Sequence, residues 1–525
     1  MTTQGRASLL IASNRGPISA SAADGADPQI TRGSGGLVSG MQVALAAVPE
    51  AVWVCAALND TERDMVADAG AGRFSDLPVV ADALGGEFAV RMLDIDEETF
   101  SDAYNGIANS TLWFLLHTLY DLSREPSFDA EWRKQWASYV RYNQIFAEAL
   151  AAEAGRGAEV IVEDYHLFLV PKMLRDLRPD LRIGLFTHIP WVSPEYFAVL
   201  PDDIAKAIIE GMLGADMLGF HTSRWANLFS ACARAVVGRE PAGVQVFPLG
   251  TDADEISERA NRADVDEALT ALEAIVGERR LIGRVDRTEP AKNVYRGLLA
   301  YRELLRTRPE WHDRVVHAVY NNPSREDVPA YRESTEAVEK LAAEINAEFA
   351  TDTWTPLILD VIDDFPTALA ILRRSDALLI NSIRDGMNLV VLEGVVLSEH
   401  APAVVLSREA GAADLLGDDA LLVNPYDVTG VAEALNTALT MSESERRERV
   451  ARMRKAAVRL PPAQWFRAQL DALDRAQPFA ASARQRAKQR QDTVRSIDHK
   501  VDRFGQLRHI DRVGADSERR QPGVA

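Results

Sequence analysis

Residues 281–293 read LIGRVDRTEPAKN and contain the clearest indication of the fold. The first five of them predict a buried strand, and the loop that follows carries Arg287 and Lys292. A helix is expected next, over residues 295–306. A strand, a loop and a helix in this order predict one unit of a parallel sheet that helices cover on both faces. Ligands bind to such sheets outside the carboxyl ends of the strands, which is where this cationic loop lies.

The same alternation runs through most of the chain. Ten short apolar runs predict buried strands, with helix-length segments between many of them: residues 8–12, 52–56, 160–162, 183–186, 217–220, 244–247, 281–285, 315–320, 377–380 and 403–406. That number of strands is too large for one doubly wound sheet. We therefore predict an α/β fold with two Rossmann-like parallel-sheet domains that face each other across a cleft.

The change of domain is expected after residues 250–252, before a polar helix over 264–277. Residues 481–520 hold 11 Lys or Arg and 6 Asp or Glu, a net charge of +5, and they lack an apolar stripe. Such a segment is typical of a solvated, poorly ordered tail. The expected organisation is two domains, a closing helical segment and this tail, at residues 1–255, 256–460, 461–478 and 479–525.

Composition narrows the class of protein. The 525 residues carry 58 Lys or Arg and 78 Asp or Glu, a net charge of −20, which argues against nucleic acids and anionic membranes as partners. With 47% hydrophobic and 26% charged residues, the chain is neither disordered nor fibrous. The two cysteines cannot form a disulfide framework, which favours a reducing cytoplasm, and no 18-residue apolar stretch suits a membrane span.

The loop after residue 285 suits a diphosphate, because Arg287 binds anions bidentately and Lys292 acts as a point charge. A solvated charged turn explains the same two residues equally well. A Gly-rich loop at 33–37, which follows Ser13-Asn14-Arg15, would also let backbone amides approach an anion, but this signal is weak by itself.

A third candidate is residues 384–389, RDGMNL, which follow a predicted strand and open a helix. The amides of Met387, Asn388 and Leu389 would point from the helix start at a phosphate. Glu393 lies further along the helix, where it can accept hydrogen bonds from a ribose, and Asp385 can accept one from a sugar hydroxyl. An Asp N-cap followed by a helical Glu is the simpler alternative.

Polar residues also stand at the ends of two predicted strands, in the runs 163–166 (EDYH) and 187–190 (THIP). Their positions indicate a pocket lined by polar side chains. Trp113 and His117 are four residues apart and share a helix face, an arrangement that suits a sugar or an ordinary core. Cys55 and Cys232 lack zinc-ligand spacing, and Asp94-Ile95-Asp96 is better explained by helix capping, so neither a metal nor a cofactor is expected.

Taken together, the chain resembles the trehalose-6-phosphate synthase family of retaining glycosyltransferases with the GT-B fold, from about Ile11 to Trp465. The motifs that carry the resemblance occur in the family's order: residues 13–15, 35–37, 164–167, 188–190, 219–220, Arg287 with Lys292, 384–389, 410–413 and 423–427.

The resemblance implies an acceptor-binding first domain and a nucleotide-sugar-binding second domain. It implies catalytic roles for Arg287, Lys292, His188 and Asp385, of which the two cations hold the donor diphosphate. The implied donor-binding residues are Gly36, Met387, Asn388, Leu389 and Glu393. The implied acceptor-binding residues, for glucose-6-phosphate, are Arg15, Tyr104, Trp113, Asp164 and Arg325.

Two departures leave alternatives open. The loop reads Thr-Glu-Pro-Ala between Arg287 and Lys292, and Asn293 stands where Gly is expected, as in the validoxylamine-7′-phosphate synthase relatives. Those relatives lose the acceptor-side Tyr and Trp, whereas Tyr104 and Trp113 are present here. The expected reaction is glucose transfer to glucose-6-phosphate. Several alternatives remain open: glycerol-3-phosphate or a cyclitol phosphate as the acceptor, and a non-catalytic sugar-phosphate sensor in place of an enzyme. The nucleotide (UDP, GDP or ADP) and a homo-oligomeric state are open as well.

Overall fold

Two parallel sheets form the framework of the chain. The computed structural model describes residues 7–476 except 23–27, 33–40, 43–44, 46–47, 49, 71, 85–87 and 326. Within that part, one sheet has seven strands in the order β5-β4-β1-β6-β7-β8-β9, and the other has six in the order β12-β11-β10-β13-β14-β15. Two Rossmann-like parallel sheets confirm the predicted fold class. The charged tail at 479–525 lies outside the described residues.

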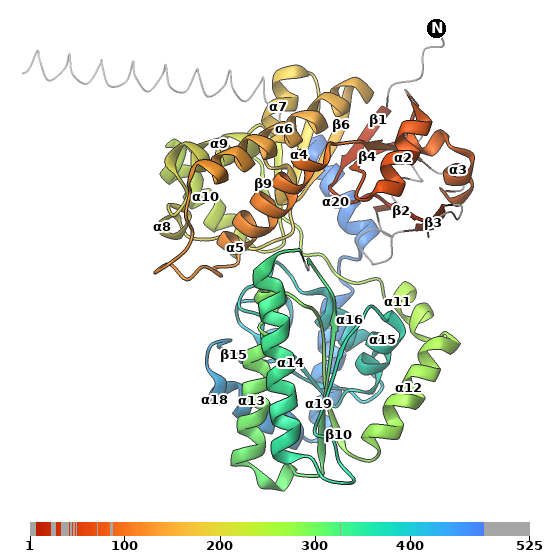
Figure 1. Cartoon of the computed structure of the whole chain (residues 1–525), viewed down its shortest axis with the longest axis vertical. Helices are drawn as coiled ribbons and strands as arrows, with labels where there is room; N and C mark the ends of the chain where they lie inside the picture. The colour runs from red at the N-terminus through yellow and green to blue at the C-terminus, as the bar shows by residue number, and fades with distance from the viewer. Residues whose placement is uncertain are drawn as a thin grey trace, which may run out of the picture. The chain divides into compact units, whose positions relative to one another are not determined.

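The first sheet is buried on both faces. Its strands are β5 (Ala89–Leu93), β4 (Val52–Ala56), β1 (Ala7–Ala12), β6 (Ala154–Glu163), β7 (Arg182–Thr187), β8 (Met217–Phe220) and β9 (Val244–Val246). One face packs against π-helix η2 (Asp102–Leu112) and helices α5 (Trp113–Leu116), α6 (Ala130–Glu153), α7 (Val170–Leu177), α9 (Asp202–Met212) and α10 (Ser223–Val237). The other face packs against α2 (Asp60–Ala69), α3 (Pro78–Leu84) and α20 (Pro462–Arg475) (Figure 1).

The second sheet has the same layered construction. Its strands are β12 (Leu357–Val361), β11 (Val315–Asn322), β10 (Arg280–Arg287), β13 (Ala377–Ile380), β14 (Ala403–Ser407) and β15 (Leu421–Val423). Helices α13 (Val294–Thr307), α14 (Pro329–Phe349) and α18 (Val428–Thr440) cover one face. The opposite face packs against α11 (Ala253–Ala260), α12 (Ala263–Val276), α15 (Phe365–Arg374), α16 (Leu389–Leu397) and α19 (Glu443–Ala457) (Figure 1).

Helix α20 returns from the second half of the chain to the first sheet. Its side chains Trp465, Phe466 and Leu473 are fully buried in the cluster that contains Ile161 of β6 and Phe186 of β7. The guanidinium of Arg182 donates to the Asp474 carbonyl and carboxylate, at 2.8 Å each. Figure 1 shows α20, in blue, beside strands drawn in red and orange. The last described helix is therefore part of the first sheet's core.

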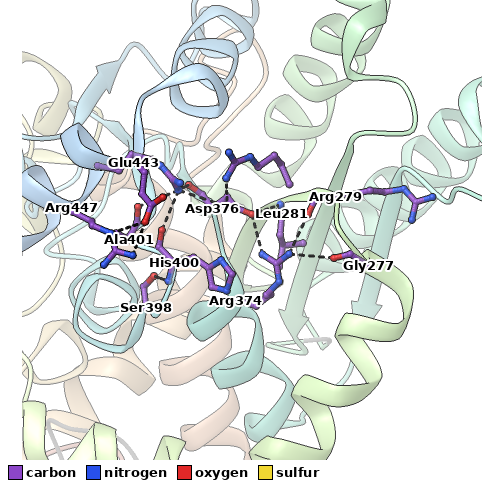
Figure 2. Close-up of polar contacts among 12 residues, drawn as sticks. Gly277, Arg279, Leu281, Arg374, Asp376, Ser398, His400, Ala401, Glu443 and Arg447 are labelled. Carbon is purple, nitrogen blue, oxygen red and sulfur yellow. Dashed lines mark hydrogen bonds and ion pairs between the residues drawn. The ribbon is translucent and has the colours of Figure 1, made fainter.

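Each sheet is tied by an aspartate that directly precedes an inner strand. Asp376, before β13, accepts the Leu281 backbone N–H at 3.0 Å and pairs with Arg374 at 3.0 Å (Figure 2). Asp216, before β8, accepts the Ile183 N–H at 2.9 Å and pairs with Arg175 at 2.5 Å. Both carboxylates fix the register of two neighbouring strands at the end of the sheet where these strands begin.

Five of the described strands are not predicted by the sequence. Strands β5, β12 and β15 lie at the edges of the two parallel sheets, and β2 (Ile18–Ser21) and β3 (Gln29–Arg32) form a separate two-stranded antiparallel sheet. Edge strands contact only one neighbour and are partly solvated, so polar residues interrupt the apolar runs of β5 and β12, whereas β15 is apolar but only three residues long. In β12, for example, only Leu357 is buried. Inner strands such as β8 and β13 coincide with their predicted ranges.

Among the described residues, no helix is long and apolar enough to cross a membrane. Cys55 and Cys232 are both free and buried.

Candidate active site

A cavity of about 400 Å³ lies at the carboxyl ends of the second sheet's strands. Side chains from the first sheet, His188 and His221 among them, complete its wall. Eight residues predicted for catalysis or donor binding line this cavity: His188, Arg287, Lys292, Asp385, Met387, Asn388, Leu389 and Glu393. Such a volume with convergent polar groups is typical of a small-molecule site.

Lys292 and Asp385 form a buried ion pair in the wall of the cavity, with Nζ 2.6 Å from Oδ2. Burial lowers the pKa of Lys292, but Asp385, Asp286 and Glu289 outweigh burial and hold it above the ordinary value. Burial raises the pKa of Asp385, yet the Lys292 ammonium holds it below the ordinary value. Lys292 is therefore a cation at neutral pH, buried where its field is weakly screened.

Two asparagines in the loops that carry these charges have a left-handed backbone conformation. Asn293 has φ 61° and ψ 36°, which explains why an Asn can stand where Gly is expected. Its amide donates to the carbonyls of Asn381 and Pro425 and so ties the Lys292 loop to the ends of other segments. Asn388, at φ 79°, accepts the Val391 N–H through its side chain.

Helix α16 begins later than the sequence predicts. Its N-cap is Asn388 rather than Asp385, and its first residue is Leu389. The carboxylate of Asp385 instead accepts hydrogen bonds from Lys292 and from the Asn388 side chain. Asp385 is thus free of the capping role that was the simpler interpretation, and it faces the cavity.

His188 enters the cavity from the first sheet and is held by two acidic residues. Its Nε2 lies 2.8 Å from Glu163 Oε2, and its backbone N–H donates to Asp164 Oδ1 at 3.0 Å. Burial lowers the pKa of His188, but the Glu163 carboxylate outweighs burial and raises it. Asp164 itself has φ 71°, a strained conformation of the kind that collects at functional sites.

A second cluster surrounds Arg325. Its guanidinium lies 4.3 Å from the Trp113 ring centre and donates to the hydroxyls of Tyr165 at 3.0 Å and Tyr331 at 2.8 Å. Burial raises the pKa of the Tyr104 hydroxyl, but Arg325 and Arg15 outweigh burial and hold it below the ordinary value. Two cations from distant segments therefore meet at one phenol.

Glu289 joins the two clusters. One carboxylate oxygen lies 2.9 Å from Arg287 and 3.4 Å from Arg325, and the side chain is fully buried. Strands β10 and β11 pair along their whole length, which places the loops after Arg287 and Asn322 side by side. The four predicted cations Arg15, Arg287, Lys292 and Arg325 thus belong to one connected site.

Several buried polar atoms beside Arg325 have no hydrogen-bond partner within the described part of the chain. They are Nε1 of Trp113, Nε2 of His166 and Nδ2 of Asn109. Buried polar groups are nearly always paired, so unpaired ones concentrated in one place indicate a surface built for a polar ligand. π-Helix η2, which carries Tyr104 and Asn109, leads directly into α5 with Trp113; π-helical turns are frequent at functional sites.

Sequence reasoning gave no role to Glu289 or Tyr331, and it noted Glu163 only as the first residue of the EDYH run that indicated a lined pocket. Glu289 lies in the loop that carries Arg287 and Lys292, where only the two cations were singled out. Tyr331 lies in α14, and no motif surrounds it. Their contacts depend on which loops the fold brings together, and no local pattern encodes that. Gly36 lies outside the described residues.

The predicted capping role of Asp96 is confirmed: its side chain accepts the Thr99 N–H at the start of the next helix. No group of three or more His, Cys, Asp or Glu within the described ranges is arranged to hold a metal ion.

The sequence of the chain matches the model of glycosyltransferase family 20 over residues 7–475. The chain belongs to this family. Family relatives include an Aspergillus fumigatus alpha,alpha-trehalose-phosphate synthase [UDP-forming], 32% identical over 91% of this chain and 92% of the relative. The chain is also 32% identical, over 85% of its length, to a bifunctional trehalose-6-phosphate synthase/phosphatase from Thermoproteus tenax, of which it spans 61%.

Solved structures of family members agree with the fold. A UDP-forming alpha,alpha-trehalose-phosphate synthase from Burkholderia xenovorans, in complex with glucose-6-phosphate, aligns with a TM-score of 0.74 and 26% identity. The alignment covers 90% of this chain and all of the other.

Proposed function

We propose that the chain transfers glucose from a nucleoside-diphosphate glucose to the anomeric hydroxyl of glucose-6-phosphate, with retention, and so forms trehalose-6-phosphate. The observation that carries the proposal is the meeting of cations from three separate segments in one site: Glu289 pairs with both Arg287 and Arg325, Lys292 lies in the Arg287 loop, and Arg15 meets Arg325 at Tyr104. Two anionic substrates need such a concentration of positive charge in a protein whose net charge is −20. Membership of the family, with relatives named trehalose-phosphate synthases, supports it.

In the donor half, Arg287 and Lys292 hold the diphosphate together with the amides of Met387, Asn388 and Leu389. Asp385 and His188 position the transferred glucose, and Glu393 binds the ribose. The UDP-forming relatives favour uridine as the base. Gly36, which lies outside the described residues, is proposed as a further donor contact.

In the acceptor half, Arg15 and Arg325 bind the phosphate of glucose-6-phosphate. Tyr104 and Trp113 bind its phosphate and ring, and the unpaired indole N–H of Trp113 is a donor suited to this polar ligand. Asp164, whose carboxylate accepts the His188 backbone N–H, is proposed to lie on the acceptor sugar side. A sugar phosphate of similar size, such as glycerol-3-phosphate or a cyclitol phosphate, is the alternative acceptor.

Retention follows from attack on the same face as the leaving group. A double displacement needs a free carboxylate beneath the sugar, whereas Asp385 is paired with Lys292 and Asp286 with Arg284. The acceptor oxygen forms the new bond to the anomeric carbon as the bond to the diphosphate breaks, and the leaving phosphate oxygen takes the acceptor's proton. Arg287 and Lys292 stabilise the charge that develops on the diphosphate.

The test is release of nucleoside diphosphate from UDP-, GDP- and ADP-glucose, each with and without glucose-6-phosphate. The proposal predicts release only when the acceptor is present, and a product with the mass of trehalose-6-phosphate. Incubation with glucose-6-phosphate, glycerol-3-phosphate and a cyclitol phosphate together identifies the acceptor by product mass. Binding of the sugar phosphate without any release would indicate a sensor and contradict the proposal.

A further inference from the structure

Trp225 of α10 forms a contact between the two sheets' domains that the proposed chemistry does not use. Its ring is 1% exposed, and its indole N–H donates at 3.0 Å to the carbonyl of Gly386, in the loop between β13 and α16. Trp225 is absent from the residues that line the donor cavity. The hydrogen bond thus joins a helix of the first sheet to the loop that carries Asp385.

Two guanidinium groups flank this ring. Arg224, from the same helix, lies 4.8 Å from the ring centre, and Arg384, from the opposite loop, lies 5.5 Å from it. Glu409 pairs with both, at 2.5 Å to Arg224 and 3.6 Å to Arg384. Arg384 also donates to the Trp191 carbonyl of the first domain. Cation–π contacts gain strength when they are shielded from water, as this buried ring is.

The loop that Trp225 contacts packs closely against His188. The backbone of Gly386 lies directly against the His188 carbonyl: a Cβ added at Gly386 would be 1.7 Å from that oxygen. Asp385 precedes Gly386, and Met387 and Asn388 follow it, so a shift at Gly386 moves several groups that line the cavity. Trp225 donates its indole N–H to the carbonyl of Gly386, at the centre of this loop.

We propose that Trp225, Arg224, Arg384 and Glu409 form a positioning cluster that fixes the Asp385 loop against His188, and thereby sets the geometry of the donor site. The inference rests on the proposed function, because it assigns a purpose to the distance between two groups that bind the donor. The four residues act through Gly386 and Asp385 rather than by touching substrate.

The decisive variant is Trp225→Phe, which keeps an aromatic ring beside both cations and removes the indole N–H together with one of the two fused rings. We expect kcat to fall by about 10- to 100-fold, since small displacements of reacting groups have effects of this size. The KM for glucose-6-phosphate should not change. The matched control is Trp354→Phe, which removes an equally buried indole N–H that donates at 2.8 Å to the Val315 carbonyl, remote from the cavity, and should leave kcat unchanged.

A second variant, Glu409→Gln, weakens the cluster from its other end and carries the test if Trp225→Phe fails to fold. The double variant should lose less activity than the product of the two single losses, because both act on the same loop. Wild-type kinetics in Trp225→Phe, or fully multiplicative losses, would overturn the cluster.

The two proposals fail separately. A wild-type chain that releases no nucleoside diphosphate with any acceptor contradicts the proposed function. The cluster is then judged from the calorimetric affinity for UDP-glucose, which Trp225→Phe should weaken and Trp354→Phe should not. A chain that neither turns over nor binds sugar nucleotides contradicts both proposals.

Discussion

Lys292 shows how one side chain acquires its chemistry from its surroundings. Buried in the cavity wall, it remains charged because Asp385, Asp286 and Glu289 surround it. Arginine is not an equivalent replacement, since its planar fork needs a different arrangement of partners. The charge is held 2.6 Å from the carboxylate of Asp385, which lines the same cavity.

The proposed function assigns Lys292 to the leaving diphosphate, so replacing it with alanine would remove a cation that stabilises the developing charge. We expect Lys292→Ala to lower kcat by about 10²- to 10³-fold, as for loss of a donor in an oxyanion hole. Lys340→Ala, at an exposed position of α14, is the control and should leave kcat unchanged. Single-turnover release of nucleoside diphosphate measures the step; an unchanged rate would remove Lys292 from the mechanism.

If Glu393 binds the ribose as proposed, donor binding should depend on pH. Burial, with a contribution from nearby Glu255, raises its pKa to about 7. The carboxylate is the better acceptor for ribose hydroxyls, so donor affinity should increase as pH rises through that value. Calorimetry across this range checks the slope. Glu393→Gln should abolish the slope, and Glu255→Gln should move it to lower pH, because a repelling charge is removed.

The raised pKa of Glu393 also affects stability, and here the effect of rising pH is unfavourable. Between the unfolded value near 4.5 and the folded value near 7, the native chain retains a proton that the unfolded chain has lost. The contribution of Glu393 to the free energy of unfolding therefore falls as pH rises across this window. Glu393→Gln should remove that decline.

At the residue scale, the sequence predicted which side chains belong to the site better than it predicted which of them contact each other. Arg287, Lys292 and Arg325 are visible because each follows a strand, and strand ends meet at one edge of a sheet. The pairing of Glu289 with two of these cations is not visible, because it depends on the neighbouring position of β10 and β11. Asn293 read as a departure, yet its left-handed backbone shows that Asn serves where Gly was expected.

Among the elements, the start of β13 illustrates how a buried carboxylate joins separate segments. Asp376 accepts from Leu281 of β10, from Arg374 of α15 and from Arg280, and Arg446 of α19 lies 3.7 Å away. Burial raises the pKa of Asp376, but the Leu281 N–H and the guanidinium groups outweigh burial and hold it below the ordinary value. Figure 2 shows how strands and helices meet at this residue.

Asp376→Asn should destabilise the chain by about 3–5 kcal/mol, because it leaves buried guanidinium groups without their counter-charge. The control is Glu443→Gln, which removes a 2.6 Å ion pair to Arg447 whose side chains are both 65% exposed; no measurable change is expected there. Denaturant unfolding compares the two variants. Equal midpoints would show that the contacts of Asp376 add nothing to stability.

Elements were predictable where both faces are buried. Inner strands of parallel sheets read as continuous apolar runs, and helix α13 (Val294–Thr307) lies within one residue of its predicted range at each end. The start of α16 was not predictable to the same precision, because an Asp N-cap at residue 385 was the simpler interpretation, whereas Asn388 caps the helix. The competing ion pair with Lys292 decides between them.

At the scale of the whole molecule, α20 links the late part of the chain to the catalytic end of the first sheet. Trp465 is fully buried, donates to the Phe247 carbonyl at 3.1 Å, and places its ring 5.6 Å from that of His188. The sequence indicated a closing helical segment but not the sheet that it covers. The domain boundaries at 255 and 460 remain our proposal.

Trp465→Ala should lower the free energy of unfolding by about 3–5 kcal/mol, as expected for a large buried aromatic side chain. Activity should fall as well, since the His188 ring loses a neighbour. Arg467→Ala, on the exposed side of the same helix, should change stability by no more than about 0.5 kcal/mol. Thermal unfolding with a parallel activity assay separates these outcomes; a Trp465→Ala variant as stable as Arg467→Ala would contradict the packing role.

The position of α20 has a consequence for biosynthesis. A ribosome makes β1 to β9 first, yet one face of that sheet stays partly uncovered until residues 462–475 emerge. Some two hundred residues, enough for the whole second sheet, are translated in the interval. The first half of the nascent chain therefore keeps apolar surface exposed during this interval. Such a surface suits binding by a chaperone that shields nascent chains.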